Sequence, residues 1–104
     1  MGHERPEYRD DLYEWDERKS ADRFNRSGFD FHLAKQVFES GRFVERWDDG
    51  DSHDEARFVA TGLVGPTFVS VVYAERGGRK RIISAFEADD DDIADYMVTY
   101  AIAD

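Results

Sequence analysis

The strongest structural signal in the sequence is a predicted β-hairpin at residues 67–85, which read TFVSVVYAERGGRKRIISA. Residues 67–74 are rich in Val, Phe and Tyr, which favour a pleated surface that is at least half buried. Gly77 and Gly78 then permit the positive φ angles that a tight hairpin turn requires. Residues 81–86 resume as a second apolar strand, so we expect the hairpin at the centre of a sheet.

The hairpin is also strongly basic, because four of the six residues from 76 to 81 are Arg or Lys. Guanidinium groups suit bidentate contact with phosphate, so Arg76 and Arg81 are candidate phosphate ligands. Arg79 and Lys80 extend this basic surface, and if the phosphate belongs to RNA they are further candidate RNA-binding residues. The alternative interpretation is a charged turn that keeps a hairpin soluble.

The chain as a whole is acidic, with a formal net charge of −10. It contains 15 Asp and 9 Glu against 11 Arg and 3 Lys. Salt screens the self-repulsion that such a charge causes, so an Asp-rich surface with few lysines favours a halophilic host over an ordinary acidic domain. An acidic chain is a poor general binder of nucleic acid, so any contact with RNA must come from a local basic patch.

The remaining composition indicates one cytoplasmic domain. A chain of 104 residues forms a single core. We expect a polar tail at residues 1–11 and one domain at residues 12–104. Cysteine is absent, which excludes disulfides and thiolate chemistry. No apolar run is long enough for a membrane span, and the N-terminus lacks the apolar region of a signal peptide.

Two helices are predicted near the N-terminus, at residues 17–27 and 31–40, each preceded by an Asp that can cap it. On the first, Lys19, Arg23 and Arg26 follow at i, i+4 and i+7 and therefore share one face. This face is either solvated, with its charges paired to nearby carboxylates, or an extension of the basic hairpin. In the second case Lys19 and Arg23 are candidate RNA-binding residues.

Further strands are predicted at residues 12–15, 43–47 and 57–63. The loop at residues 48–55 is rich in carboxylates but lacks calcium-loop spacing, so we expect a solvated loop and neither a metal nor a cofactor. Four Asp at residues 89–92 suit the start of a final helix. Its apolar face would consist of Ile93, Tyr96, Met97, Tyr100 and Ala101.

The order of these elements predicts an α+β fold. It would contain an antiparallel sheet, formed by a meander of about four strands plus a short N-terminal edge strand. Two N-terminal helices and one C-terminal helix would pack on this sheet, because helices and strands occur in separate runs.

Several short blocks occur in an order and spacing typical of one protein family. They are Trp15, Asp16, Glu17 and Lys19; Gly28, Phe29, Asp30, Phe31, Ala34, Val37 and Phe38; Arg57, Phe58 and Gly62; Val72, Tyr73, Ala74, Glu75, Arg76 and Gly77; and Arg81, Ile82, Ile83, Ser84 and Ala85. Over residues 13–96 the chain thereby resembles the BrnT toxins of type II toxin–antitoxin systems. The resemblance implies a fold similar to RelE-type ribonuclease toxins and metal-independent cleavage of RNA. It also implies a cognate antitoxin, through which alone operator DNA would be bound.

The chain departs from the family pattern at several basic positions. Ser27 and Arg23 stand where family members often have His and Asn, and Phe86 and Glu87 stand where Arg usually follows. The final helix, normally basic, opens with acidic residues 89–92. The motifs that build the fold are therefore kept, whereas several basic groups expected near RNA are missing.

Cleavage of RNA without a metal requires a base for the 2′-hydroxyl, a cation for the phosphorane and an acid for the leaving oxygen. Arg76 and Arg81 are the predicted catalytic cations, and Glu75 is the nearest possible base. Tyr73 would stack on a nucleobase or donate a proton. Two functions stay open: an mRNA-cleaving toxin, or a catalytically weakened protein of the same fold that acts through antitoxin binding and operator repression. A generic salt-adapted domain is a third, less favoured interpretation.

Overall fold

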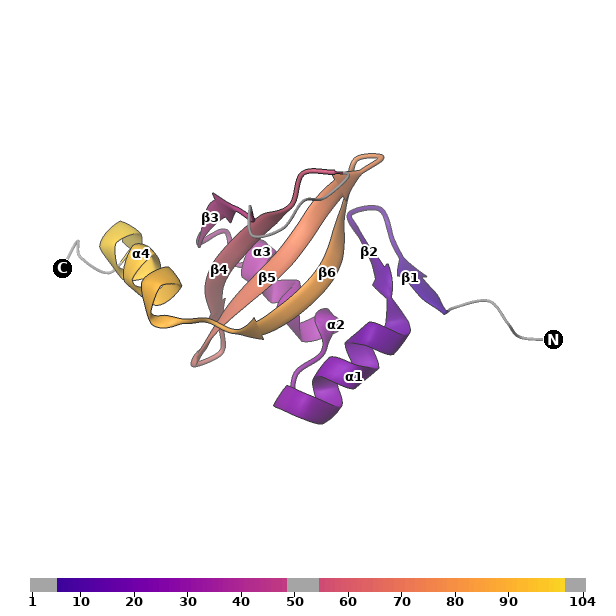
Figure 1. Cartoon of the computed structure of the whole chain (residues 1–104), viewed down its shortest axis with the longest axis horizontal. Helices are drawn as coiled ribbons and strands as arrows, with labels where there is room; N and C mark the ends of the chain where they lie inside the picture. Colours follow the sequence, from indigo (N-terminus) through magenta and orange to yellow (C-terminus); the bar gives the residue numbers. More distant parts are fainter. Residues whose placement is uncertain (1–5, 49–54, 101–104) are drawn as a thin grey trace.

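The computed structural model describes residues 6–48 and 55–100 as an α+β fold with one mixed sheet (Figure 1). Its six strands lie in the order β1-β2-β6-β5-β4-β3. The strands are β1 (Glu7–Arg9), β2 (Tyr13–Asp16), β3 (Phe43–Trp47), β4 (Phe58–Val64), β5 (Thr67–Arg76) and β6 (Arg79–Glu87). The helices are α1 (Glu17–Ser27), α2 (Phe31–Ala34), α3 (Gln36–Glu39) and α4 (Asp90–Tyr100). The predicted fold class is confirmed.

The predicted hairpin forms β5 and β6 at the middle of the sheet. Its turn consists of Gly77 and Gly78, whose φ angles of 56° and 82° lie in the left-handed region that favours glycine. With β3 and β4, the two strands form the predicted antiparallel meander. The register between β5 and β6 shifts between Val72 and Tyr73, which produces a bulge.

The strand predicted at residues 12–15 corresponds to β2 and does not lie at the edge of the sheet, contrary to the expectation. β2 pairs in parallel with β6, with Trp15 opposite Ile82. On its other side β2 pairs with β1, and this pairing is antiparallel. Both Trp15 and Ile82 are fully buried, so the parallel pairing adds directly to the core. The ring of Tyr8 on β1 stacks on Trp15 with centroids 4.1 Å apart. Part of the predicted polar tail is thus a strand, while the division into tail and domain stays a prediction.

The first two helices begin at the predicted capping residues. Asp16 Oδ1 accepts a 2.8 Å hydrogen bond from the backbone N–H of Arg18 at the start of α1. Asp30 Oδ1 accepts a 2.9 Å bond from the backbone N–H of Leu33. The second predicted helix is divided at Lys35 into α2 and α3, because a ψ angle of −18° at this residue tightens the turn.

The core lies between the sheet and the α2–α3 pair. Its largest fully buried side chains include Trp15, Phe31, Val37, Val71 and Ile82. Because side chains alternate between the two faces of a strand, the charged residues of the hairpin fall on both faces of the sheet. This alternation decides which of the predicted site residues meet.

α3 approaches β4 very closely at Gly62. A Cβ atom at this position would lie 2.9 Å from the backbone oxygen of Arg42 and 3.2 Å from Cγ1 of Val37. The absence of a side chain therefore permits the close packing of α3 on the sheet. No positive φ angle is involved here, so the requirement for glycine is one of space.

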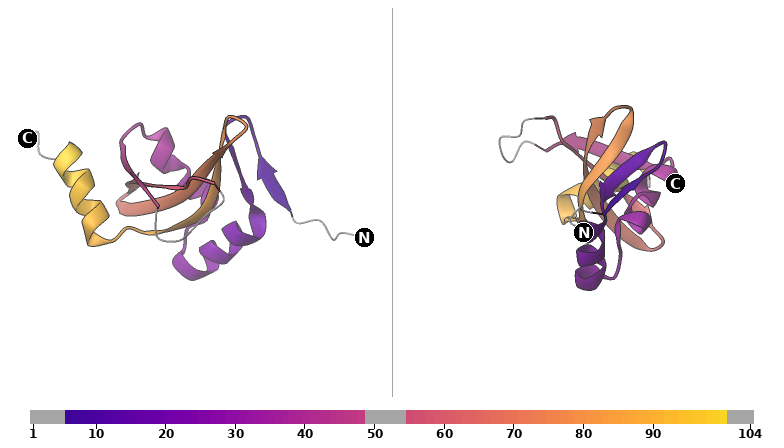
Figure 2. Two further views of the ribbon diagram at one scale, coloured as in Figure 1. Left: turned by 45° about the horizontal axis from the view of Figure 1, so that its top comes forward. Right: turned by 90° about the vertical axis from the view of Figure 1, so that its right-hand side faces the viewer.

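α4 packs on the other face, at the opposite end of the sheet from β1 (Figures 1 and 2). Arg46 Nε of β3 donates a 2.8 Å hydrogen bond to the buried carboxylate of Asp92. The hydroxyl of Tyr100 donates to a backbone oxygen of β3 at 3.0 Å. The predicted apolar face is only partly covered, because Tyr96 is buried whereas Met97 is 43% exposed.

Two sequence-based expectations fall partly outside the described ranges. Ala101 of the predicted apolar face and residues 49–54 of the predicted carboxylate loop are not among the described residues. Among the helices that are described, none is long and apolar enough to cross a membrane.

Candidate functional site

A cleft lies between α1 and β6, where the edge of β6 is no longer covered by a strand. β2 pairs with residues 80–82 of β6, so within the described chain the following residues of β6 have no strand on this side. The cap at Asp16 starts α1 at this point, and the helix continues along the uncovered edge (Figure 1). The basic stripe of α1 faces the strand across the cleft.

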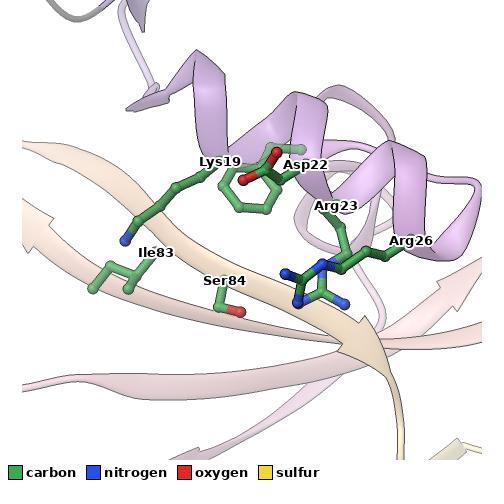
Figure 3. Close-up of a pocket in the computed structure, with 7 residues that line it drawn as sticks. Lys19, Asp22, Arg23, Arg26, Ile83 and Ser84 are labelled. Carbon is green, nitrogen blue, oxygen red and sulfur yellow. The ribbon is translucent and has the colours of Figure 1, made fainter.

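The cavity in this cleft has a volume of about 290 Å³. Its lining consists of Lys19, Asp22, Arg23, Arg26, Phe31, Ile83 and Ser84. Figure 3 shows that Lys19 reaches from α1 toward Ile83, while Arg23 and Arg26 reach toward β6 near Ser84. Three cations therefore share the cavity with one carboxylate.

These three cations, Lys19, Arg23 and Arg26, form no ion pair with any carboxylate of the described residues, 6–48 and 55–100. Arg23 Nη1 donates to Ser27 Oγ at 3.3 Å, which leaves most of the five guanidinium donors available. Charged donors form the stronger hydrogen bonds with phosphate oxygens, so the cleft can bind a phosphodiester.

The predicted catalytic arginines of the hairpin already bind carboxylates. Arg76 pairs with both carboxylate oxygens of Glu55, with Nε 3.0 Å from Oε2. The hydrogen bond from Arg76 holds the pKa of Glu55 below its usual value. Arg81 Nη1 lies 2.8 Å from Oε1 of Glu7 and 3.0 Å from Oε2 of Glu14. A phosphate that approaches either arginine therefore competes with these carboxylates.

The side chain of Glu75 does not share a face of the sheet with the side chains of Arg76 and Arg81. It pairs with Lys80 across the hairpin, with Nζ of Lys80 3.8 Å from its carboxylate. Lys80 also lies 5.4 Å from the ring centre of Phe38 on α3, which places the pair on the face that α2 and α3 cover. Strand alternation puts Arg76 and Arg81 on the opposite face.

Tyr73 and Arg79 also have internal partners. Only 3% of Tyr73 is exposed, and its hydroxyl donates a hydrogen bond to Glu45. Burial, followed by this hydrogen bond, raises the pKa of Tyr73 far above its usual value of 10. Arg79 Nε donates to the backbone oxygen of Asp10 at 2.7 Å. Tyr73 is thus a core residue that is covered from stacking with a base.

Of the residues predicted for RNA, only Lys19 and Arg23 lie in the cleft. Sequence reasoning did not select Arg26, although its i+7 spacing from Lys19 was the signal that placed it on the same face. Asp22 and Ser84 carried no comparable signal, because the cavity brings them together from distant parts of the chain. In the described part of the chain, no three His, Cys, Asp or Glu side chains are grouped as a metal site requires.

Comparison with protein families gives a match over most of the chain. The family model described as "Ribonuclease toxin, BrnT, of type II toxin-antitoxin system" matches residues 15–92, which is three quarters of the chain. The matched range includes α1 and all of β6, so it contains both sides of the cleft. Comparison with curated proteins found no match.

Proposed function

Because the chain belongs to the BrnT family of ribonuclease toxins of type II toxin–antitoxin systems, we propose that it cleaves RNA in the cleft between α1 and β6. The supporting observation is that Lys19, Arg23 and Arg26 line one cavity and have no ion pair among the described residues. Two guanidinium groups and an ammonium group suit a phosphodiester and the phosphorane that forms during its cleavage.

The proposed reaction requires no metal ion. The RNA 2′-hydroxyl attacks the adjacent phosphorus while its proton passes to Asp22. The P–O5′ bond then breaks, and the released 5′ oxygen takes a proton from water, leaving a 2′,3′-cyclic phosphate. Arg23 and Arg26 hold the phosphate oxygens, and Lys19 stabilises their growing charge. Asp22 replaces Glu75 as the candidate base because Asp22 lines the cavity.

Arg76 and Arg81 remain candidates for contacts with flanking phosphates. RNA would gain these contacts by displacing Glu55 from Arg76, and two further carboxylates from Arg81. Each contact would therefore replace one charge-assisted bond by another. We expect Arg76→Ala and Arg81→Ala to affect cleavage less than substitutions in the cleft.

The test is cleavage of RNA by the purified chain in the presence of EDTA, with product analysis for the cyclic phosphate. Arg23→Ala and Arg26→Ala should each lower the rate at least about tenfold, because a charge-assisted contact is typically worth ~1.5–3 kcal/mol. Arg18→Ala is the matched control, since Arg18 is an exposed arginine of α1 that does not line the cavity. An equal loss of cleavage rate in all three variants would exclude the cleft as the site of cleavage. Loss of activity in EDTA would exclude a metal-free reaction.

The second candidate is a protein of the same fold with weakened nuclease activity. The neutralised hairpin arginines favour it, because the carboxylates reduce the positive charge available to RNA. Such a protein would act by binding an antitoxin and repressing an operator. It would bind its partner normally and leave RNA intact under every condition of the cleavage assay.

The family implies a protein partner, the antitoxin. We propose that it silences the chain by covering the cleft and that it supplies the DNA-reading domain, since this acidic chain is a poor binder of DNA by itself. RNA cleavage should therefore stop when the antitoxin is added. The complex, unlike the chain alone, should shift operator DNA in a gel.

A further inference from the structure

A second cavity, of about 250 Å³, lies at the turn end of the β5–β6 hairpin, on the face that α3 covers. Its lining consists of Leu12, Tyr13, Phe38, Phe43, Glu75, Gly78 and Lys80. Tyr13 and Phe38 form its buried floor, while Phe43 is half buried and Leu12 is 62% exposed. The cavity is thus a small aromatic hollow with one ammonium and one carboxylate at its rim.

The two charged groups present adjacent and opposite hydrogen-bonding functions. An ammonium group only donates hydrogen bonds, and a carboxylate only accepts them. Lys80 and Glu75 are paired across the hairpin with their charged atoms 3.8 Å apart. A ligand that bridges them must offer an acceptor next to one or more donors.

The position of Lys80 is supported by aromatic contacts. Its Nζ lies 5.4 Å from the ring centre of Phe38 and 5.6 Å from that of Tyr73. An exposed Lys–Glu pair alone contributes little to stability. These cation–π contacts hold the ammonium over the aromatic floor instead of leaving it in solvent.

We propose that this cavity binds one unpaired guanine base of the RNA substrate, an inference that rests on the proposed function. The ring would stack against Phe43, as unpaired bases stack on aromatic side chains. Guanine O6 would accept from Lys80, and its neighbouring N1–H and N2–H groups would donate to the two oxygens of Glu75. Adenine presents one donor and one acceptor along this edge, so it cannot satisfy both carboxylate oxygens.

The guanine site and the cleft both involve β6. Lys80 and Ile83 are three residues apart, which corresponds to roughly 10 Å along a strand. Glu75 and Lys80 would select the base on the face that α3 covers, whereas the cleft beside the uncovered part of β6 would bind the backbone.

The test uses the full chain and fluorescent 2′-O-methyl pentanucleotides, which lack the nucleophile and cannot be cleaved. UUGUU should bind about tenfold more tightly than UUAUU or than the inosine form, which lacks the N2 amino group, because a bidentate base contact discriminates to this extent. Glu75→Gln and Lys80→Met should each bring the three affinities close together. Asp95→Asn, an exposed change of charge on α4, should keep the preference.

Two further measurements separate this inference from the proposed function. Equal affinity for the three pentanucleotides, while ordinary RNA is still cleaved, would overturn the guanine site and leave the nuclease proposal standing. A preference that survives both Glu75→Gln and Lys80→Met would also overturn it. If guanosine monophosphate binds as tightly as UUGUU, the ligand is a free nucleotide and the assignment to RNA is wrong.

Discussion

Single residues differ in how well their partners can be anticipated. The basic stripe of α1 follows from helical spacing alone, because Lys19 and Arg23 are one turn apart. The carboxylates on the hairpin arginines could not be predicted in this way, because Glu55 is 21 residues from Arg76, and Glu7 is 74 residues from Arg81. Such contacts depend on the completed sheet.

The pair formed by Glu55 and Arg76 should contribute to acid sensitivity. The hydrogen bond from Arg76 lowers the pKa of Glu55 from its usual value of 4.5. The pair therefore stabilises the folded state at pH values above 4.5, and this stabilisation is lost as the pH falls through the lowered pKa. We expect the free energy of unfolding to fall more steeply for the wild type than for Glu55→Gln between about pH 5 and pH 3. Urea denaturation at several pH values measures this, and parallel curves would contradict it.

Tyr73 should prove structural. Tyr73→Phe keeps the buried ring and removes only the hydrogen bond to Glu45, so the protein should lose about 1 kcal/mol of stability. Its rate of RNA cleavage should stay within about twofold of the wild type, because Tyr73 is buried and does not line the cleft. A twofold change in rate corresponds to a ΔΔG‡ of ~0.4 kcal/mol. A large fall in rate with the fold intact would instead assign the hydroxyl to catalysis.

At the scale of elements, the local signals proved sufficient for the hairpin and the helix caps. Gly77, Gly78, Asp16 and Asp30 each act on neighbours in the sequence, so their effects were predictable. β1 was not predictable, because Tyr8 is its only large apolar residue. The parallel pairing of β2 with β6 was missed because no local pattern specifies which distant strand will be its neighbour.

The close packing of α3 on β4 should make Gly62 sensitive to substitution. Gly62→Ala introduces a methyl group against the backbone of Arg42, which cannot move as a flexible side chain can. We expect a loss of ~1–3 kcal/mol in thermal or urea unfolding, as for other overpacked sites. Gly77→Asn is the control, because its Cβ meets open space and Asn tolerates the left-handed region, so its stability should barely change.

For the whole molecule, we expect stability to increase with salt. The net charge of −10 is repulsive at low ionic strength. The Debye length falls from ~30 Å at 0.01 M to ~3 Å at 1 M salt, so the repulsion should be largely screened. Thermal unfolding in increasing KCl measures the effect. A melting temperature that stays constant or falls would remove the halophilic interpretation.

The complex with the antitoxin should also persist in molar KCl. Salt weakens exposed ion pairs but does not weaken apolar burial, and α4 presents Met97 and Val98 to solvent. Apolar contacts should therefore dominate the affinity, while charged groups set the orientation. Size-exclusion chromatography of the co-expressed pair at low and molar KCl tests this. Dissociation at high salt would indicate an interface held mainly by charge.

The parallel neighbours β2 and β6 have a consequence for biosynthesis. Tyr13 pairs with Lys80, and Arg23 faces Ser84 across the cleft, so each pairing waits for more than 60 further residues. At a translation rate of ~5–20 residues per second, the delay is roughly 3–12 s. A nascent chain that ends before β6 has the basic helix but nothing opposite it. A ribosome must therefore translate through β6 before its product has both sides of the proposed RNA-cleaving cleft.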